Sequence, residues 1–166
     1  MRQINSLVFV LILIFAALTG CSLAASGDGA AGEAAVEEGE CSPTRADALG
    51  PFYKPGAPQR SKVGEGYRLS GTVQSAEDCT PIPGAQIEFW LAGPDGNYSD
   101  EYRAVMAADA QGSYTFESHT PPAYAGRPPH IHIRVSAEGY GTLVTQHYPQ
   151  TGETGSVFDL VLAPES

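Results

Sequence analysis

Basic residues are scarce in this sequence. Its 166 residues include 9 Lys and Arg against 19 Asp and Glu, which gives a formal net charge of −10 at pH 7. Nucleic acids and anionic lipid surfaces attract proteins mainly through clustered Lys and Arg, so this composition argues against both as partners. Any attachment to a membrane must therefore come from something other than electrostatic docking.

Helical periodicity is also missing from residue 49 onward. That part of the sequence has no sustained 3.6-residue apolar pattern, no internal repeat, no phosphate-binding loop and no nucleophile elbow. These absences argue against a helical bundle, a P-loop enzyme and an α/β-hydrolase. The sequence has instead 19 Gly and 13 Pro, which divide it into short apolar alternations.

Seven short segments have the two-residue alternation of a β-strand with one buried face. Turn-forming Gly, Pro, Asn and Asp residues separate them. We expect strands at residues 67–74, 86–91, 103–107, 113–117, 130–136, 143–148 and 157–162. This pattern predicts an all-β domain built as a β-sandwich.

One long apolar run lies at the N-terminus. Residues 7–18 are uniformly apolar, follow the positively charged Arg2, and end in Leu18-Thr19-Gly20-Cys21. The run is short for a membrane-spanning helix and has the layout of a secretory signal. Its last four residues resemble the lipobox of bacterial lipoproteins, which implies cleavage before Cys21 and lipidation of that residue. An ordinary secretory signal and an uncleaved anchor are the alternatives.

The next segment, residues 21–40, is rich in Ala, Gly and Ser, contains five acidic residues and lacks Lys and Arg. Such a composition cannot build a core and is typical of a flexible tether. We therefore expect a lipoprotein signal peptide at residues 1–20, an acidic tether at 21–40 and a folded domain at 41–166. The protein would be extracytoplasmic, in a bacterial cell envelope, and held at the membrane only through its lipid anchor.

Three cysteines are present, and the lipobox accounts for Cys21. Outside the cytoplasm, an even pair of cysteines in a small domain is more often a disulfide than a pair of metal ligands. We predict a disulfide between Cys41 and Cys79, which would close a long loop around the first strand. Two unpaired buried thiols are the alternative.

The segment with the most chemical information is Arg127-Pro128-Pro129-His130-Ile131-His132. On a strand, His130 and His132 project from one face, while Ile131 and Ile133 project from the other. The apolar face can pack into a core, which leaves two imidazoles side by side, as a metal requires. Surface strands and buried hydrogen-bonded pairs also contain His-x-His, so the pair alone does not establish a metal site.

Two tyrosines precede this strand on loops that could fold over the histidines. Tyr98 follows Gly96-Asn97, and Tyr124 lies just before the histidine segment. A phenolate is a hard, anionic oxygen donor that suits Fe(III) better than Zn(II) or Cu(I). Two phenolates and two imidazoles therefore suggest a ferric site. Packing at the edge of the core is the alternative for each tyrosine.

Taken in order, these segments resemble the intradiol ring-cleavage dioxygenases, the group that contains catechol and protocatechuate dioxygenases. The resemblance spans roughly residues 49–152. Besides the histidine segment it rests on Gly50-Pro51-Phe52-Tyr53, residues 69–73, the turn at 81–85 leading to Glu88-Phe89-Trp90, Gly96-Asn97-Tyr98, residues 109–116, and Thr145-Gln146.

The resemblance implies a prealbumin-like β-sandwich and one non-haem Fe(III) held by Tyr98, Tyr124, His130 and His132. It implies an enzyme that inserts O2 into a catechol-type aromatic ring and yields a cis,cis-muconate-type dicarboxylate. Tyr124 would be displaced by the substrate and would help to take up its protons. Arg127 would stabilise negative charge near the metal, and Gln146 would line the site.

The sequence departs from the catechol enzymes in two respects. The low-complexity segment before residue 41 leaves no room for their helical N-terminal dimerisation segment, so the oligomeric state stays open. The loop from Tyr124 to His130 is short. A short loop predicts either an open site that accepts bulky or polymeric catechols, or a site too exposed for efficient turnover.

Two other classes of function fit parts of the pattern. Sandwiches of this kind are often binding or structural domains, so a non-catalytic lipoprotein binding module is one alternative. A metal-storing or copper-binding protein that uses only the two histidines is another. The remaining chemistry-bearing residues have simpler interpretations: we expect His119 and His147 to be solvated or hydrogen-bonded, and Tyr53 to pack.

Overall fold

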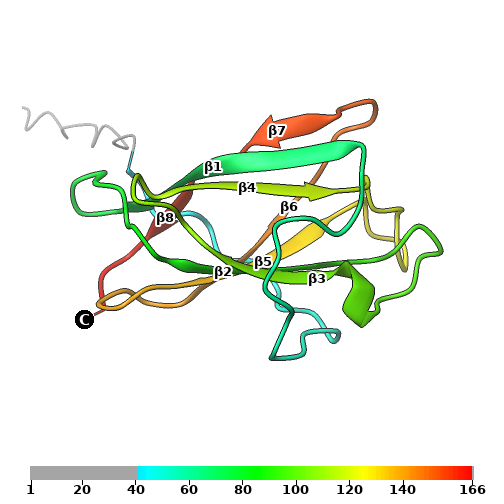
Figure 1. Cartoon of the computed structure of the whole chain (residues 1–166), viewed down its shortest axis with the longest axis horizontal. Coiled ribbons are helices and arrows are strands. Elements are labelled where there is room, and N and C mark those ends of the chain that lie inside the picture. The colour runs from blue at the N-terminus through cyan, green and yellow to red at the C-terminus, as the bar shows by residue number, and fades with distance from the viewer. Residues whose placement is uncertain (1–40, 166) are drawn as a thin grey trace, which may run out of the picture. The chain divides into compact units, whose positions relative to one another are not determined.

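The computed structural model describes residues 41–165, which form a sandwich of two β-sheets (Figure 1). The predicted signal peptide, Cys21 and the tether lie outside the described residues. Within residues 41–165, no helix is long and apolar enough to span a membrane. The elements are β1 (Tyr67–Ser75), β2 (Gln86–Leu91), the 3-10 helix η1 (Asp100–Tyr102), β3 (Arg103–Ala107), β4 (Ser113–Ser118), β5 (Ile131–Ser136), β6 (Leu143–His147), β7 (Gly155–Val157) and β8 (Leu160–Leu162).

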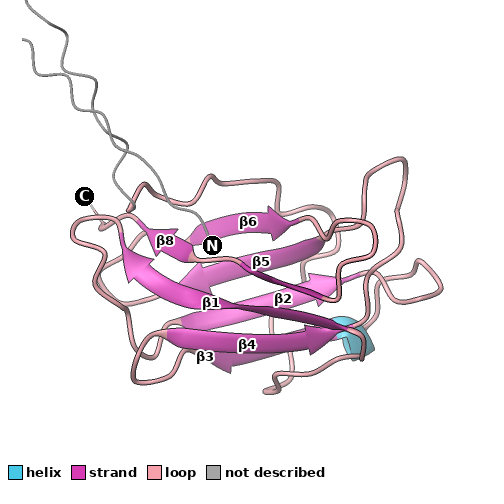
Figure 2. Cartoon of the chain, turned by 90° about the horizontal axis from the view of Figure 1, so that it is seen from above, coloured by secondary structure: helices cyan, strands magenta, loops and turns pink. Residues whose placement is uncertain are grey.

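One sheet has the strand order β3-β2-β5-β6, and all of its pairs are antiparallel. In the other sheet β1 pairs with β4 on one side (Figure 2), and with β7 and then β8 on the other (Figure 1). Both β7 and β8 run parallel to β1. The all-β sandwich predicted from the sequence is confirmed.

The strand predicted at 157–162 is wrong in one respect, because the chain forms two short strands there. Between β7 and β8, the amide of Thr72 on β1 donates to Oδ1 of Asp159 at 2.8 Å, where a backbone carbonyl would continue the ladder. The carbonyl of Phe158 instead accepts the hydroxyl of Tyr114 at 2.6 Å. The side chains of Asp159, between β7 and β8, and of Tyr114 on β4 therefore interrupt the pairing, and the alternation of apolar residues does not reveal this.

The core lies between the sheets. Ile131, Ile133 and Val135 of β5 are completely buried, which confirms that the face of this strand opposite His132 packs inward. Phe89 of β2 stacks on Phe116 of β4 across the sandwich, with ring centroids 4.1 Å apart. Each large apolar side chain buried in this way contributes about 1.5 to 3 kcal/mol, so the core fixes β5 firmly.

Residues 41–53, which we call the N-terminal strap, run along the edge of the sandwich between the two sheets. The amide of Thr44 donates to the carbonyl of Val161 on β8 at 3.0 Å. Three residues later, the amide of Asp47 donates to the carbonyl of Val144 on β6 at 2.9 Å. The strap therefore joins one sheet to the other and continues toward the end of β5.

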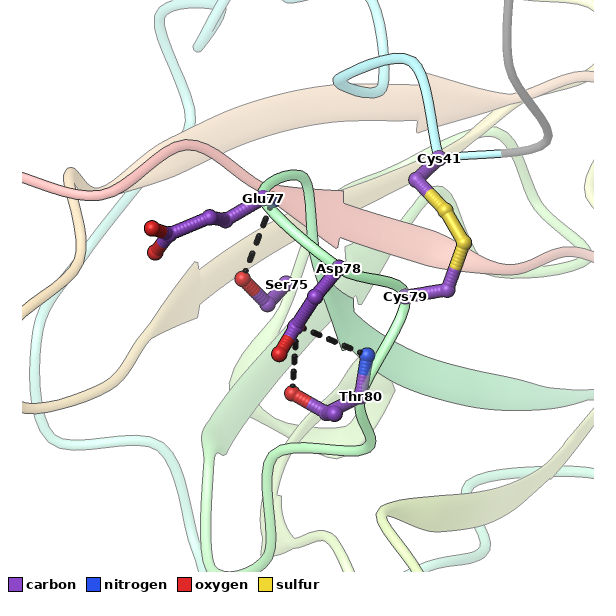
Figure 3. Close-up of a disulfide and its surroundings, with 6 residues drawn as sticks. All are labelled: Cys41, Ser75, Glu77, Asp78, Cys79 and Thr80. Atoms are coloured by element: carbon purple, nitrogen blue, oxygen red, sulfur yellow. Dashed lines mark hydrogen bonds between the residues drawn. A yellow bond between two sulfur atoms is a disulfide. The ribbon is translucent and has the colours of Figure 1, made fainter.

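The strap begins at a disulfide. Cys41 and Cys79 are bonded, with their Cα atoms 5.2 Å apart, as the sequence predicts (Figure 3). The turn that presents Cys79 is pinned by Asp78, whose Oδ1 accepts from the amide and the hydroxyl of Thr80 at 3.1 and 2.7 Å. One end of the strap is thus held covalently to the turn that follows β1.

Candidate metal centre

A cavity of about 300 Å³ lies where the strap, two loops and β5 meet. It contains all four ligands suggested by the sequence, together with Arg127. The residues that line it are Pro51, Phe52, Tyr98, Tyr124, Ala125, Arg127, His130 and His132. Segments far apart in the sequence therefore converge on His132 of β5 and on His130 just before it.

His130 immediately precedes β5, is buried, and has a defined tautomer. Its Nδ1 lies 2.8 Å from the carbonyl oxygen of Pro128. Because a carbonyl can only accept, Nδ1 holds the hydrogen and Nε2 keeps a free lone pair. This lone pair lies 3.2 Å from the hydroxyl of Tyr98, which donates to it. Nε2 of His130 and the hydroxyl oxygen of Tyr98 would both be available as ligands to a metal in this cavity.

His132 lies beside His130, with ring centroids 4.8 Å apart, and stacks on Trp90 at 4.9 Å and an interplanar angle of 5°. Burial, and to a lesser degree the neighbouring His130, lowers the pKa of His132 to about 4. The ring is therefore neutral at pH 7, as a metal ligand must be. Its Nδ1 is buried and has no hydrogen-bond partner among the described residues.

Gly50 of the strap packs directly against His132. Its φ is +74°, and a Cβ at this position would lie 2.9 Å from Cε1 of the imidazole. Only glycine satisfies both the left-handed backbone and the close approach. The two residues that follow it, Pro51 and Phe52, form one wall of the cavity.

Tyr98 is held by stacking and remains protonated without a metal. The ring of Phe52 lies parallel to it, with centroids 4.3 Å apart and an angle of 10°. Burial raises the pKa of Tyr98 to about 12. A nearby cation would oppose this shift, because a positive charge favours the phenolate.

Tyr124 and Arg127 are brought together by a tight hairpin. Each donates its amide to the other's carbonyl, at 3.2 and 2.9 Å, and only Ala125 and Gly126 lie between them. These two residues have φ values of +49° and +78°, the left-handed pair typical of a two-residue hairpin turn. Directly opposed residues project to the same face, so the phenol and the guanidinium point together into the cavity.

Gln146 lies behind Arg127 instead of on the wall of the cavity. It is 4% exposed and opposes His132 across the β5 and β6 pair. Its Oε1 accepts from Nη2 of Arg127 at 2.7 Å, and its side-chain amide donates to the carbonyl of Ala48. Gln146 is therefore not among the residues that line this cavity, and its side chain contacts Arg127 and the strap. Its expected part in the site stays a prediction.

The donor set fits a ferric ion. Among the described residues, no three His, Cys, Asp or Glu side chains gather closely enough to hold a metal. Besides the two histidines, the cavity contains the phenolic oxygens of Tyr98 and Tyr124 as donor atoms. The lone pair of His130 and the neutral, buried His132 are suitable nitrogen donors. Two imidazoles with two phenolates match a hard trivalent cation such as Fe(III).

The other chemistry-bearing residues lie outside this cavity, as expected. Nε2 of His119 is 2.9 Å from the carbonyl of Ala92, and Nε2 of His147 is 2.6 Å from the hydroxyl of Tyr67. Tyr53 packs edge-on against Trp90, and its hydroxyl donates to Glu88.

Sequence reasoning missed Phe52, Trp90 and Tyr148, each of which contacts a ligand or Arg127, and Asp47, which accepts a hydrogen bond from Tyr148. The sequence contains a pattern that could have identified one of them, Tyr148. Tyr148 is two residues from Gln146, so the alternation of an extended chain sends both side chains to the same side. For Asp47 the sequence offers no such signal.

Relatives of this chain are found among the 1,2-dioxygenases, although no family model matches it. A chlorocatechol 1,2-dioxygenase of Rhodococcus opacus is 36% identical over 60% of this chain and 53% of that protein. A hydroxyquinol 1,2-dioxygenase of Nocardioides simplex is 32% identical over 66% and 48%. An intradiol ring-cleavage dioxygenase of Aspergillus niger is 27% identical over 69% and 48%. The chain thus spans about half the length of the curated relatives it matches.

Solved structures share the fold. The dioxygenase domain of a dioxygenase and carbohydrate-binding protein fusion from the cellulolytic bacterium Streptomyces sp. SirexAA-E has a TM-score of 0.68 and 28% identity, and the match covers 75% of this chain and 100% of that chain. The 3-chlorocatechol 1,2-dioxygenase of Rhodococcus opacus 1CP has a TM-score of 0.65 and 19% identity, with coverage of 74% and 73%. The sandwich around the cavity is therefore the fold of these domains.

Proposed function

We propose that this chain, a homologue of the intradiol ring-cleavage dioxygenases, is an Fe(III)-dependent enzyme that uses O2 to open a catechol-type ring between its two hydroxyl-bearing carbons. The product would be a cis,cis-muconate-type dicarboxylate. The convergence of Tyr98, Tyr124, His130 and His132 with Arg127 on one cavity carries the proposal. A binding module has no need for this combination.

Fe(III), when bound, would supply a Lewis acid and an electron acceptor for the catechol. Tyr98 and His130 suit the role of fixed ligands, because Phe52 stacks on the first and the carbonyl of Pro128 orients the second. His132 is equally fixed, by Trp90 and Gly50. These three positions preorganise the site before any metal enters.

Tyr124 suits a movable role. It lies at the start of the exposed two-residue hairpin and makes edge contacts with the rings of Phe52 and Tyr98, at 5.5 and 5.6 Å. Its phenolic oxygen, when anionic, would be able to accept a proton from a catechol hydroxyl. The neighbouring Arg127 would then stabilise the negative charge that develops on the ring oxygens.

The walls of the cavity suit an aromatic substrate. Pro51, Phe52 and Ala125 are apolar and would exclude water from one side of the ring. Only two residues separate Tyr124 from Arg127, so within residues 41–165 this hairpin adds no long loop over the cavity, which favours catechols with bulky substituents. The Streptomyces domain, matched over its whole length, supports the view that a unit of this size suffices for a dioxygenase.

We also propose that the protein works outside the cytoplasm, anchored by lipid at Cys21. The lipobox supports the anchor, and the Cys41 to Cys79 disulfide is in keeping with an oxidising compartment. The substrate would then be an aromatic compound met in the cell envelope or beyond it.

The test is the visible absorption spectrum and iron content of the protein, with the fluorescence of Trp90 as a third readout. Trp90 is the only tryptophan and stacks on His132, so its emission should be quenched as Fe(III) binds. We expect one iron per chain, a tyrosinate-to-iron charge-transfer band, and a shift of this band on anaerobic addition of a catechol.

The substitution Tyr98→Phe should abolish the colour and the oxygen uptake. Tyr53→Phe is the matched control, because it removes a tyrosine hydroxyl that bonds Glu88 away from the cavity. A wild-type protein that stays colourless and takes up no Fe(III) would refute the ferric site and favour the binding module. Metal content unchanged by Tyr98→Phe would favour a site made of the two histidines only.

A further inference from the structure

A line of hydrogen bonds leads from Arg127 out of the cavity to the N-terminal strap. Nη2 of Arg127 donates to the hydroxyl of Tyr148 at 2.9 Å. That hydroxyl lies 2.7 Å from Oδ2 of Asp47. Oδ1 of Asp47 accepts from the amide of Ala48 at 2.6 Å. Three segments distant in the sequence are thus connected through one phenol.

The direction of each bond in this line is fixed by chemistry. A guanidinium can only donate and a carboxylate can only accept, so Tyr148 accepts from Arg127 and donates to Asp47. Donation to a charged carboxylate makes the phenolic oxygen a better acceptor for Arg127. The hydrogen bonds from Tyr148 and from the amide of Ala48 hold the pKa of Asp47 below its usual range, which keeps the carboxylate ionised at neutral pH.

A second set of hydrogen bonds also connects Arg127 to the N-terminal strap. Gln146 accepts from Arg127 at 2.7 Å and donates its side-chain amide to the carbonyl of Ala48. The two side chains that accept hydrogen bonds from Arg127, those of Tyr148 and Gln146, therefore bond to consecutive residues of the strap, Asp47 and Ala48. The strap is fixed there, since the amide of Asp47 donates to the carbonyl of Val144 on β6 at 2.9 Å.

Arg127 needs hydrogen-bond partners from other segments because it lies on a short, exposed turn. A long, flexible side chain on a two-residue hairpin has many rotamers, and few of them keep the guanidinium over the cavity. We propose that Tyr148 and Asp47 are positioning residues that hold Arg127 in its orientation toward the substrate. The proposal deepens the proposed function and rests on it for the catalytic consequence, although the positioning itself is measurable without activity.

The experiment compares Tyr148→Phe and Asp47→Ala with the wild type in the full-length protein. Tyr53→Phe is the matched control, because it also removes a hydrogen bond between a tyrosine hydroxyl and a carboxylate, but away from the cavity. The first readout is nitrogen-15 NMR of the arginine side chains in the metal-free protein. An immobilised guanidinium gives sharp, separate signals that broaden when the group becomes free to rotate. We expect the Arg127 signals to broaden in both variants and to stay unchanged in the control.

The second readout is steady-state turnover of catechol by the iron-loaded protein. Misplacement of a charged group by about an ångström costs up to roughly 100-fold in rate, so we expect kcat/KM to fall by about 10-fold to 100-fold. Fe(III) binding, followed through Trp90 fluorescence, and the thermal midpoint should match those of Tyr53→Phe. In an Arg127→Gln background, Tyr148→Phe should change kcat/KM by less than about 2-fold, because the guanidinium that Tyr148 positions is gone.

Sharp, unshifted Arg127 signals in both variants would overturn the proposal, whatever the activity. An undiminished effect of Tyr148→Phe in the Arg127→Gln background would overturn it as well. A wild type that turns over no catechol would refute the proposed function alone, and the NMR comparison would still decide whether Tyr148 and Asp47 hold Arg127.

Discussion

Gly50 illustrates how a single backbone position controls the metal centre. Its left-handed φ of +74° is costly for any residue with a Cβ, and the space where a Cβ would lie is taken by the ring of His132. The same ring stacks on Trp90 from another side. The orientation of His132 is therefore restricted from two sides, and the geometry of the ligand set depends on a residue that contributes no ligand.

We predict that Gly50→Ala weakens Fe(III) binding. The left-handed backbone alone should cost about 1 to 2 kcal/mol of stability, and the clash at 2.9 Å from Cε1 should turn His132 away. Gly56→Ala is the control, because Gly56 has φ +79° but no atom within 4 Å of an added Cβ. Titration with Fe(III), followed by Trp90 fluorescence, should separate the variants. Equal affinities would show that the contact with His132 is unimportant.

At the scale of elements, the strap and the hairpin complete a site that the sheet only begins. β5 supplies the rigid base, since its opposite face is fully buried in the core. The strap adds Gly50, Phe52 and the anchor for Arg127, and the hairpin adds Tyr124 and Arg127 itself. The disulfide holds the first residue of the strap, so it belongs to the architecture of the site as well as to the stability of the domain.

We predict that replacing both Cys41 and Cys79 with Ser lowers the free energy of unfolding. The bond spans 38 positions of the sequence, and a loop of that length corresponds to about 3 to 4 kcal/mol of stabilisation in the chain-entropy model. The wild type treated with a reductant should show the same thermal midpoint as the double variant. Iron uptake well below that midpoint should persist, because hydrogen bonds from Thr44 and Asp47 hold the strap independently. An unchanged midpoint would contradict the prediction.

At the scale of the whole molecule, the fold keeps several ionisable groups neutral. Burial lowers the pKa of His132 to about 4 and also lowers the pKa of His147, whose ring contacts Tyr67 inside the sandwich. The unfolded chain binds a proton at each position near pH 6.5, whereas the folded chain binds it only at lower pH. Stability is therefore fully present above about pH 6.5 and is lost as the pH falls toward the folded pKa values.

We predict that the metal-free protein loses stability between pH 6.5 and pH 4, by about 3 kcal/mol through His132 alone. Urea unfolding at several pH values measures this loss. His147→Gln should reduce the slope, because Gln does not titrate and its side chain can still bond the hydroxyl of Tyr67. A flat profile over this range, or an identical slope in the variant, would contradict the assignment.

Most of the fold was predictable because strand alternation is a local property. The predicted strands at 86–91 and 103–107 have the observed bounds, and the next, at 113–117, ends one residue early. The division of the last strand was not predictable. It depends on Asp159 and Tyr114 reaching across to other strands, and these contacts exist only once the sheet is assembled.

The sequence by itself determined the donor types and one geometric relation, that His130 and His132 share a face, since side chains on a strand alternate with a period of two. The lipid anchor at Cys21 also stays a prediction of the sequence alone. Only the tertiary structure decided that Tyr98 and Tyr124 meet those histidines in one cavity. It also decided that Gln146 bonds Arg127, and that Asp47 is connected to Arg127 through the hydroxyl of Tyr148. The physical reason is that loop positions are set by hydrogen bonds and ring contacts between segments distant in the chain, which no local pattern encodes.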